Sequence, residues 1–299
     1  MDTSAFLPSP SFTVPFISPH ELGVRMGRAD SPLLLDVRRD EKFGQSAVRL
    51  AGALRCSPQQ IHEFAASQPR RPVLVYCVYG HNISAYAVEV LRLAGWDAHA
   101  LAGGCEGGEP GVDAEGQRQA WRQERAPVVA QKPEWGVTGE NPSRWITRER
   151  PKIDRIACPW LVRRFIDPRA EFFYVPTASV LQEAERLGAV AYDIPGAPVS
   201  HDGELCSFDV LMRSFGLSAS GLETLARIVR GADTDRLDLA PQSAGLMALS
   251  LGFSQLYAND HEMLEAAMPM YDALYAWCRN AQAEPHSWRP ETMVAGARS

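Results

Sequence analysis

Short apolar runs in the first third of the chain predict strands of a buried sheet. Residues 33–37 (LLLDV) and 73–77 (VLVYC) are almost continuously apolar, which is typical of strands covered on both faces in a parallel sheet. Apolar side chains at helical spacing follow at residues 84–93, and Gly95 is well placed to end that helix. Residues 97–104 (DAHALAGG) predict another short strand. This alternation indicates an α/β domain with a central, mainly parallel sheet.

The second half of the chain has mainly helical patterns. Pro159 stands where a first-turn proline would open a helix over residues 160–166, and Asp167-Pro168 would close it. Short strands are expected near residues 171–175 and 189–194. Five further helices are predicted at 178–187, 208–215, 219–230, 242–257 and 260–281. A second, mainly α-helical domain is therefore expected.

A polar stretch separates the two patterns. From about residue 104 to 150 the chain is rich in Gly, Pro, Gln, Glu and Arg and has little periodicity. A structureless stretch of that length is unusual inside one compact domain, so it predicts an interdomain connector. The expected organisation is an α/β domain at 15–110, a polar linker at 111–142, a second domain at 143–282 and a flexible tail at 283–299.

Composition and charge narrow the classes of function. The 299 residues are 45% hydrophobic and 22% charged, as in a folded protein, and a formal charge of −6 gives no general attraction for nucleic acid. The six cysteines lie at long intervals without a CxxC pair, no signal-peptide pattern opens the chain, and no apolar run reaches the roughly 18 residues of a membrane span. We therefore expect a cytoplasmic protein with reduced thiols that binds neither membranes nor nucleic acid.

Cys77 is the leading candidate for a reacting group. It ends a predicted buried strand and is followed by a short loop and the start of a helix. Unpaired backbone N–H groups at such a start favour a thiolate, a persulfide or a bound oxyanion. Gly80 lets the loop curl tightly, and His81, Asn82 and Ser84 complete the expected cradle. The alternative is that Cys77 is a buried strand-end residue without chemistry.

Three motifs resemble those of rhodanese domains. They are LLDVR at 34–38, the loop that begins with Cys77 and the following helix, and LAGGCEGG at 101–108. The resemblance implies that Cys77 accepts a sulfane sulfur as a persulfide and passes it to a thiophilic acceptor. It also implies that Asp36 and Arg38 brace the fold and the site.

Two positions depart from the rhodanese pattern. Asn82 stands where active members commonly have Arg or Thr, and Gly108 where a Trp often ends the glycine-rich motif. Loss of a cation weakens thiosulfate binding, although a protonated His81 could partly replace it. We therefore expect weak thiosulfate:cyanide activity. Cys105, in the glycine-rich motif, is a candidate to resolve a persulfide as a disulfide, with an inert turn residue as the alternative.

Cations gather around the start of one predicted helix in the second half. They are Arg150, Lys152, Arg155, Arg163 and Arg164. Cations at a helix N-terminus oppose its dipole, and a bound anion would relieve this. Lys152, Arg155 and Arg163 are therefore candidate anion-binding residues. The alternative is that carboxylates such as Asp154 and Asp167 pair with them.

The same stretch belongs to a wider resemblance. Together with residues 200–211, 228–241 and 256–278 it resembles the C-terminal domain of the ChrB-type chromate-resistance family, over residues 143–282. The resemblance implies a role in chromate resistance as a sensor, a regulator or a reductive helper.

Imidazole and carboxylate groups in the second half suit a transition metal such as Fe, Mn or Zn. The preferred ligands are His201, Asp233 and His261, with Cys206 as an optional fourth. His261 lies in the first turn of its predicted helix, where the dipole disfavours imidazolium and keeps a lone pair free. The alternative is that the acidic residues are helix caps and turn formers.

Three hypotheses follow. The first is a sulfurtransferase-like protein, in which Cys77 carries persulfide or undergoes thiol redox chemistry on small sulfur or oxyanion substrates. Its second domain would bind an oxyanion or a metal and serve chromate resistance. The second hypothesis is a non-catalytic sensor of chromate or metal. The third is a metalloenzyme whose C-terminal domain holds a redox metal through His201 and His261.

Overall fold

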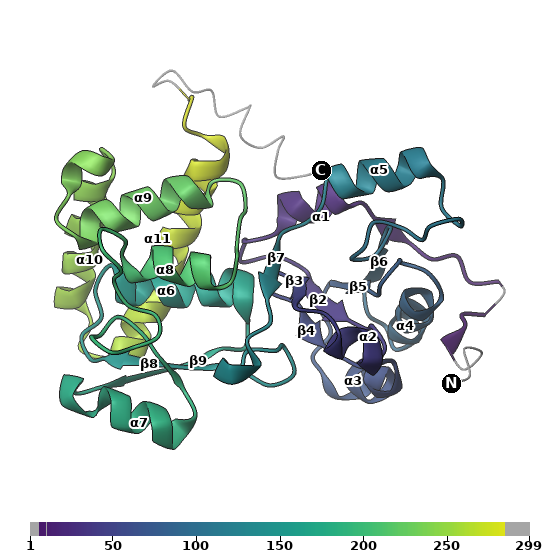
Figure 1. Ribbon diagram of the computed structural model, residues 1–299, viewed down its shortest axis with the longest axis horizontal. Coiled ribbons are helices and arrows are strands. Elements are labelled where there is room, and N and C mark those ends of the chain that lie inside the picture. The colour runs from purple at the N-terminus through teal and green to yellow at the C-terminus, as the bar shows by residue number, and fades with distance from the viewer. Residues whose placement is uncertain (1–5, 10, 285–299) are drawn as a thin grey trace.

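The computed structural model describes residues 6–9 and 11–284, so almost all of the tail expected at 283–299 lies outside the described residues. Two α/β units lie side by side and are joined by the connector, with the N-terminal unit in purple and blue and the C-terminal unit in green and yellow (Figure 1).

The N-terminal unit is built on a five-stranded parallel sheet in the order β1-β6-β5-β2-β4. Its strands are β1 (Phe16–Ile17), β2 (Leu33–Asp36), β4 (Leu54–Arg55), β5 (Val73–Tyr76) and β6 (Ala98–Leu101). The apolar runs thus form the strands that the pattern predicts, and the α/β fold class of this unit is confirmed.

Both faces of this sheet are buried, which explains why its central strands are apolar throughout. Side chains alternate along β5, so Val73 and Val75 belong to one hydrophobic cluster while Leu74 and Tyr76 belong to another. The helices of this unit are α1 (Pro19–Arg25), α2 (Asp40–Gly44), α3 (Ile61–Ser67) and α4 (Asn82–Leu93). Helices α3 and α4 supply residues of the first cluster, which includes Ile61 and Leu91.

The connector is structured. It contains α5 (Glu115–Gln123) and β7 (Val128–Ala130), and β7 pairs antiparallel with β3 (Val48–Leu50) of the first unit. Val129 is fully buried between the two units, and Ala130 N–H donates to the Phe215 carbonyl at 2.9 Å. The polar composition of the connector therefore comes largely from α5, most of whose residues are exposed. The connector is not an unstructured linker.

The C-terminal unit carries a three-stranded parallel sheet in the order β10-β8-β9. Its strands are β8 (Arg144–Arg148), β9 (Glu171–Val175) and β10 (Val190–Ala191). Strand β8 lies at the end of the stretch that the composition assigned to the connector, and it was not predicted. The chain leaves central β8 for β9 on one side and then returns to β10 on the other.

Helices surround this small sheet and make the C-terminal unit mainly helical, as expected. They are α6 (Asp154–Leu161), α7 (Val180–Leu187), α8 (Ser207–Ser214), α9 (Leu222–Asp233), α10 (Ser243–Leu256) and α11 (Asp260–Asn280). Helix α7 covers one face of the sheet with Val180 and Ala184, and α6 covers the other. None of the helices in the described ranges is long and apolar enough to cross a membrane.

The predicted start of the helix at Pro159 is wrong, because Pro159 lies inside α6. Proline lacks the N–H that would bond to the carbonyl four residues earlier, which is that of Arg155. The Tyr192 hydroxyl donates to this carbonyl instead, at 3.3 Å. A π-helical turn at Val162–Ile166 then ends the helical run.

The two units share one hydrophobic cluster. It contains Leu34 and Tyr76 of the first sheet together with Trp160 and Phe165 of the second unit. The two units therefore pack against each other through buried side chains of both.

Candidate functional sites at Cys77 and at an Asp–His cluster

Cys77 follows the last residue of β5 and stands directly before the loop that leads into α4. The residue is only 5% exposed, but it lines a surface pocket of about 330 Å³. Phe6, Tyr79 and Ile83 supply apolar surface, and the charged lining residues are Arg38, Arg39, Glu41, Lys42, His81 and Glu109. Cys77 therefore borders a space that is large enough for a small molecule.

The glycine-rich segment after β6 fixes the shape of the Cys77 loop. Gly80 has a φ of +82°, and a Cβ there would lie 2.7 Å from the Gly104 nitrogen. Cys105 N–H donates to the Cys77 carbonyl at 3.0 Å, and Glu106 N–H donates to the Val78 carbonyl at 2.9 Å. The two loops thus approach so closely that a side chain at Gly80 would not fit.

The loop leaves backbone donors free. Within the described residues, the N–H groups of Val78, Tyr79, Gly80 and His81 donate to no acceptor. Helix α4 begins directly afterwards at Asn82, which is exposed. Ser84 is fully buried in the first turn of α4, and its hydroxyl has no hydrogen-bond partner among the described residues. Unpaired N–H groups at a helix start are suited to an anion.

His81 does not supply the unpaired cation that the sequence suggested. Its Nε2 lies 3.0 Å from Asp113 Oδ2 and 3.8 Å from Glu109 Oε2, so a protonated ring would be neutralised. Arg39 and Lys42 line the pocket instead, and neither pairs with a carboxylate in the described part of the chain. Sequence reasoning missed them, although they follow a buried strand whose carboxyl end lies at the same sheet edge as Cys77.

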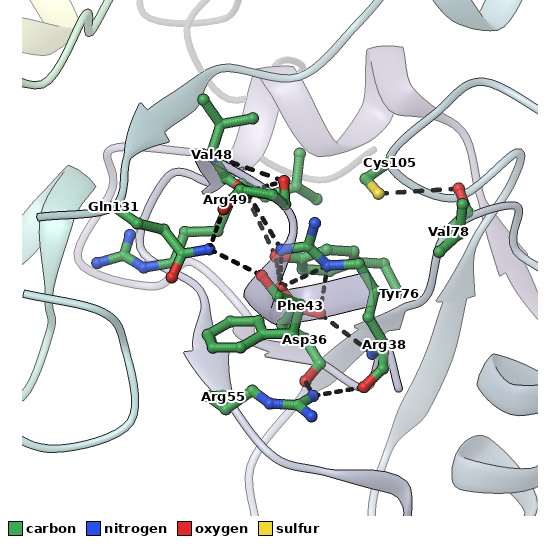
Figure 2. Close-up of polar contacts among 12 residues, drawn as sticks. Asp36, Arg38, Phe43, Val48, Arg49, Arg55, Tyr76, Val78, Cys105 and Gln131 are labelled. Carbon is green, nitrogen blue, oxygen red and sulfur yellow. Dashed lines mark hydrogen bonds and ion pairs between the residues drawn. The ribbon is translucent and has the colours of Figure 1, made fainter. Parts of the chain in front are cut away.

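Asp36 and Arg38 form a buried ion pair (Figure 2), and Arg38 also lines the Cys77 pocket. Arg38 Nε donates to Asp36 Oδ1 at 2.9 Å, and the Tyr76 hydroxyl donates to Asp36 Oδ2 at 2.8 Å. Burial raises the pKa of Tyr76 well above its ordinary value, so the hydroxyl keeps the proton that it donates. The Leu50 N–H donates to the same hydroxyl at 3.2 Å. These contacts link β2, β3 and β5, which is a bracing role.

Cys105 lies in a different cluster from Cys77. It belongs to the interdomain cluster, whereas Cys77 faces the α3–α4 side of the sheet. Burial raises the pKa of Cys105 to about 12, which keeps it a thiol at neutral pH. Gly108 accommodates Trp121 of α5, because a Cβ at Gly108 would lie 2.8 Å from the indole. The Trp121 indole of the connector therefore packs against Gly108, the position at which the rhodanese pattern often has a Trp.

A second site lies in the C-terminal unit, where ligand atoms of Asp154, His201 and Asp233 all lie within 4.8 Å of one another. His201 Nε2 is 3.0 Å from Asp233 Oδ2 and 3.8 Å from Asp154 Oδ2. Asp193 Oδ1 lies 3.4 Å from the same nitrogen. We call these four residues the Asp–His cluster.

Asp154 is the most deeply buried residue of the cluster. It is the first residue of α6, it is fully buried, and it accepts hydrogen bonds from the N–H groups of Ser207 (2.6 Å) and Phe208 (3.0 Å) at the start of α8. Burial, with the nearby carboxylates of Asp233 and Asp193, raises its pKa well above the usual range. Ile153 precedes it with a φ of +40°, a costly conformation for a β-branched residue.

The other acids of the cluster come from the ends of separate elements. Asp233 is the last residue of α9, and burial followed by the Asp193 carboxylate raises its pKa. Asp193 follows β10, and its Oδ2 lies 3.2 Å from Arg155 Nε and 3.5 Å from an Arg148 nitrogen. Three carboxylates therefore meet two arginines and one imidazole.

The cluster lies at the carboxyl ends of parallel strands β8 and β10. Arg148 ends β8, and Asp193 comes two residues after β10. The chain passes from β8 to its neighbour β9 and then crosses to β10 on the opposite side of β8. In open α/β sheets ligands bind outside the carboxyl ends of the strands, which is where this cluster lies.

Two predicted metal ligands are not part of the cluster. The exposed His261 ring packs edge-on against Tyr174, with ring centroids 5.3 Å apart, at the start of α11. Cys206 is buried, its thiol donates to Asp209 Oδ2 at 3.3 Å, and burial raises its pKa far above the usual range. Sequence reasoning missed Asp154 as a site residue and treated it as a counter-ion for nearby arginines.

The predicted anion site at Lys152, Arg155 and Arg163 is not assembled. Arg155 pairs with Asp193, Arg163 pairs with Glu265, and Lys152 has no carboxylate partner among the described residues. Carboxylates therefore neutralise two of the three cations. These carboxylates, Asp193 and Glu265, lie far from the arginines in sequence. Asp154 and Asp167, which the sequence suggested as partners, are not the ones used.

The fold and the two sites define a rhodanese-like α/β domain followed by a distinct α/β domain with an Asp–His cluster. Family comparison identifies both. Residues 18–109 match the family model of the rhodanese-like domain, and residues 145–278 match that of the ChrB C-terminal domain. The chain therefore carries these two domains in this order.

Several individual proteins are similar to parts of the chain. The chain is 33% identical to the protein ChrB of Cupriavidus metallidurans over 150 residues, which are 47% of this chain and 45% of that protein, so less than half of the relative's length is matched. A rhodanese homologue from Thermus thermophilus is 27% identical, covering 30% of this chain and 96% of its own, with a TM-score of 0.26. A rhodanese-like domain from Anabaena sp. is 23% identical, covering 39% and 79%, with a TM-score of 0.29.

Proposed function

We propose that the N-terminal domain is a sulfur carrier in which Cys77 accepts and releases a sulfane sulfur. The position of Cys77 carries the proposal: the residue lines a pocket of about 330 Å³, next to loop N–H groups that donate to no acceptor among the described residues. Arg39 and Lys42 add positive charge to the same pocket. Local positive potential favours the thiolate, which is the nucleophilic form of cysteine.

The sulfur step is a displacement on sulfur. The Cys77 thiolate attacks the outer sulfur of an anionic donor such as thiosulfate, an S–S bond forms at Cys77, and sulfite leaves with the electron pair of the broken bond. The terminal sulfur of the persulfide then moves to a thiophilic acceptor, and the thiolate is restored. The N–H groups of the loop would hold the negative sulfur in both steps.

Thiol mapping tests this proposal. At neutral pH Cys77 should react with an alkylating reagent faster than the other five cysteines. All six cysteines are buried, but Cys77 lines the pocket beside the loop. Burial raises the pKa of the other five, to about 11 for Cys56 and Cys278, about 12 for Cys105, and further for Cys158 and Cys206. Thiosulfate or polysulfide should add one sulfur to the wild type and none to Cys77→Ser, measured by mass spectrometry.

The matched control for this experiment is Cys105→Ser, which removes a buried thiol of the neighbouring loop. It should take up sulfur as the wild type does. Equal labelling of all six thiols, or sulfur uptake by Cys77→Ser, would show that Cys77 is not the carrier.

We propose a second function for the C-terminal domain, which is to hold a divalent transition metal at Asp154, His201 and Asp233. The meeting of three ligand atoms within 4.8 Å favours it. One imidazole and two carboxylates suit Fe, Mn or Zn and leave coordination positions open. When bound, the ion would act as a Lewis acid or redox centre toward an oxyanion substrate. Asp193 would stay paired with Arg155 and orient the cluster.

Calorimetric titration with Mn²⁺ or Zn²⁺ tests the metal site. His201→Ala should weaken binding by more than about a hundredfold, since residues that only hydrogen-bond to ligands already account for about 10- to 100-fold. His261→Ala is the matched control, because His261 is also exposed but lies outside the cluster. Equal binding by His201→Ala and the wild type would rule the site out.

The same site should bind metal more weakly as the pH falls. The pKa values of Asp154 and Asp233 are raised, so these groups hold protons at a higher pH than ordinary carboxyls do. A metal must displace those protons, and its affinity is therefore lower at pH 5.5 than at pH 7.5. Titrations at both pH values should show this loss in the wild type; a constant affinity would contradict the assignment of these ligands.

We also propose that the chain serves chromate resistance, on the strength of its ChrB C-terminal domain. In a growth assay on chromate, both Cys77→Ser and His201→Ala should lower resistance if the sulfur carrier and the C-terminal site act together. Loss with His201→Ala alone would instead favour the non-catalytic sensor and would reject a role for the sulfur step.

A further inference from the structure

Four arginines from both domains line a cleft that neither proposed function uses. Arg28 follows α1, Arg71 precedes β5, and Arg163 and Arg164 lie in the π-helical turn after α6. The cleft has a volume of about 180 Å³. Leu33 of β2 also lines it, so it lies at the amino end of the first sheet, whereas Cys77 lies at the carboxyl end.

Each guanidinium is held in place by only some of its donors. Arg28 and Arg164 each use Nε and Nη2 for a carboxylate, that of Asp30 and Asp272 respectively. Arg163 uses Nη1 for Glu265, and Arg71 uses Nη2 for the Ser31 carbonyl. A guanidinium has five N–H donors. All four residues therefore keep N–H groups that no acceptor in the described ranges engages.

The surroundings of the cleft favour an anion. Three of the four arginines pair with carboxylates, but none of these carboxylates is among the described residues that line the cleft. Arg71 pairs with no carboxylate in the described part of the chain, so the cleft keeps an excess of positive charge. Its remaining walls are largely apolar, with Leu22, Met26 and Leu34 among them. Arg28 and Arg71 are exposed, but the side chains of Arg163 and Arg164 are 23% and 17% exposed, so water screens these two only partly. Charge-assisted hydrogen bonds in such partly buried places are stronger than those on an open surface.

We propose that this interdomain cleft binds a small tetrahedral oxyanion, a dianion of the sulfate type. Its volume lies below the roughly 300–1,000 Å³ of pockets for drug-sized ligands, which suits an anion of a few atoms. Planar guanidinium forks match the oxygens of such anions. Because two of the arginines come from each domain, a bound anion would also strengthen the contact between the domains. This proposal does not depend on either function proposed above.

Calorimetric titration with sodium sulfate, hydrogen phosphate and chromate, at ionic strength held constant with sodium chloride, tests the proposal. The full chain should show saturable binding of at least one of the three, and the tightest identifies the physiological class. Arg71→Gln should weaken that binding by about tenfold, the effect of one lost charge-assisted contact. Arg71→Lys, which keeps the charge, should retain more of the affinity.

Arg186→Gln is the matched control, because Arg186 is an exposed arginine of α7 that does not line the cleft. It should bind the anion as the wild type does. Absence of saturable binding would overturn the proposal. So would wild-type affinity in Arg71→Gln, which would place the anion elsewhere, such as in the Cys77 loop, and so would an equal loss in Arg186→Gln, which would show a general effect of charge.

Discussion

At the scale of single residues, two fully buried carboxylates, Asp36 and Asp154, differ in how their charge is compensated. Asp36 is fully buried but ionically paired with Arg38 and hydrogen-bonded to Tyr76. Asp154 is also fully buried, but its hydrogen-bond donors are two backbone N–H groups and the Cys158 thiol, and its near neighbours include other carboxylates. A paired charge of the first kind braces a fold, whereas a poorly compensated one of the second kind is typical of a binding site.

The bracing role predicts a large loss of stability in Asp36→Asn. Removing one partner of a buried ion pair leaves the other charge uncompensated, which costs about 3–5 kcal/mol. Asp30→Asn, which breaks the exposed Arg28–Asp30 pair, should cost less than about 1 kcal/mol. Urea unfolding of both variants checks this, and equal losses would show that the Asp36 pair does not brace the domain.

At the scale of elements, sequence patterns predicted the strands and helices that depend on residues close together in the chain. The runs at β2 and β5 and the periodicity of α4, α7 and α11 fixed those elements to within a few residues. Strand β8 was missed because Arg144 and Arg148 at its ends gave it a polar composition. The start of α6 was misplaced because its interior proline is tolerated through Tyr192, a contact between residues 37 apart in the chain. Local patterns cannot show such partners.

The Tyr192 contact predicts coupling between two substitutions. Tyr192→Phe leaves the Arg155 carbonyl without its donor and should destabilise the protein by about 1–3 kcal/mol. In a Pro159→Ala background the new Ala N–H can bond to that carbonyl within the helix, so the same change should cost less. A double-mutant cycle measured by urea unfolding gives the coupling; additive effects would mean that the hydroxyl does not substitute for the missing N–H.

At the scale of the whole molecule, the Asp–His cluster was only half predicted because its residues are far apart in the chain and meet only in the folded structure. Its members come from α6, the ends of β10 and α9, and the loop before α8, so their distances follow from the packing of the sheet and helices. His201 and Asp233 could be named from residue chemistry, but nothing local separated them from His261. The position of Cys77 between a strand and a helix followed from the sequence, because strand, loop and helix are consecutive in the chain. Arg39 and Lys42 were missed, because they reach the same pocket from a different strand end.

The shared cluster predicts that the two domains unfold together. Gly27 lies at this contact with a φ of +75°, and a Cβ there would overlap the Phe165 ring and lie 2.7 Å from a Tyr275 carbon. Arg279 of α11 strengthens the same contact, donating to the carbonyls of Val24 and Met26 at the end of α1. We expect one calorimetric transition for the wild type and two separated transitions for Gly27→Ala, because the substitution would push the domains apart.

Gly188→Ala is the control that separates this contact from backbone strain. Gly188 also has a positive φ, of +60°, but a Cβ there would meet no atom within 4 Å. That variant should lose about 1–2 kcal/mol, the cost of a left-handed conformation, and keep a single transition. If Gly27→Ala also unfolds in one step with the same small loss, the domains are not coupled through this contact. The arginine-lined cleft, which Gly27 also lines, would then have no interdomain contact to strengthen.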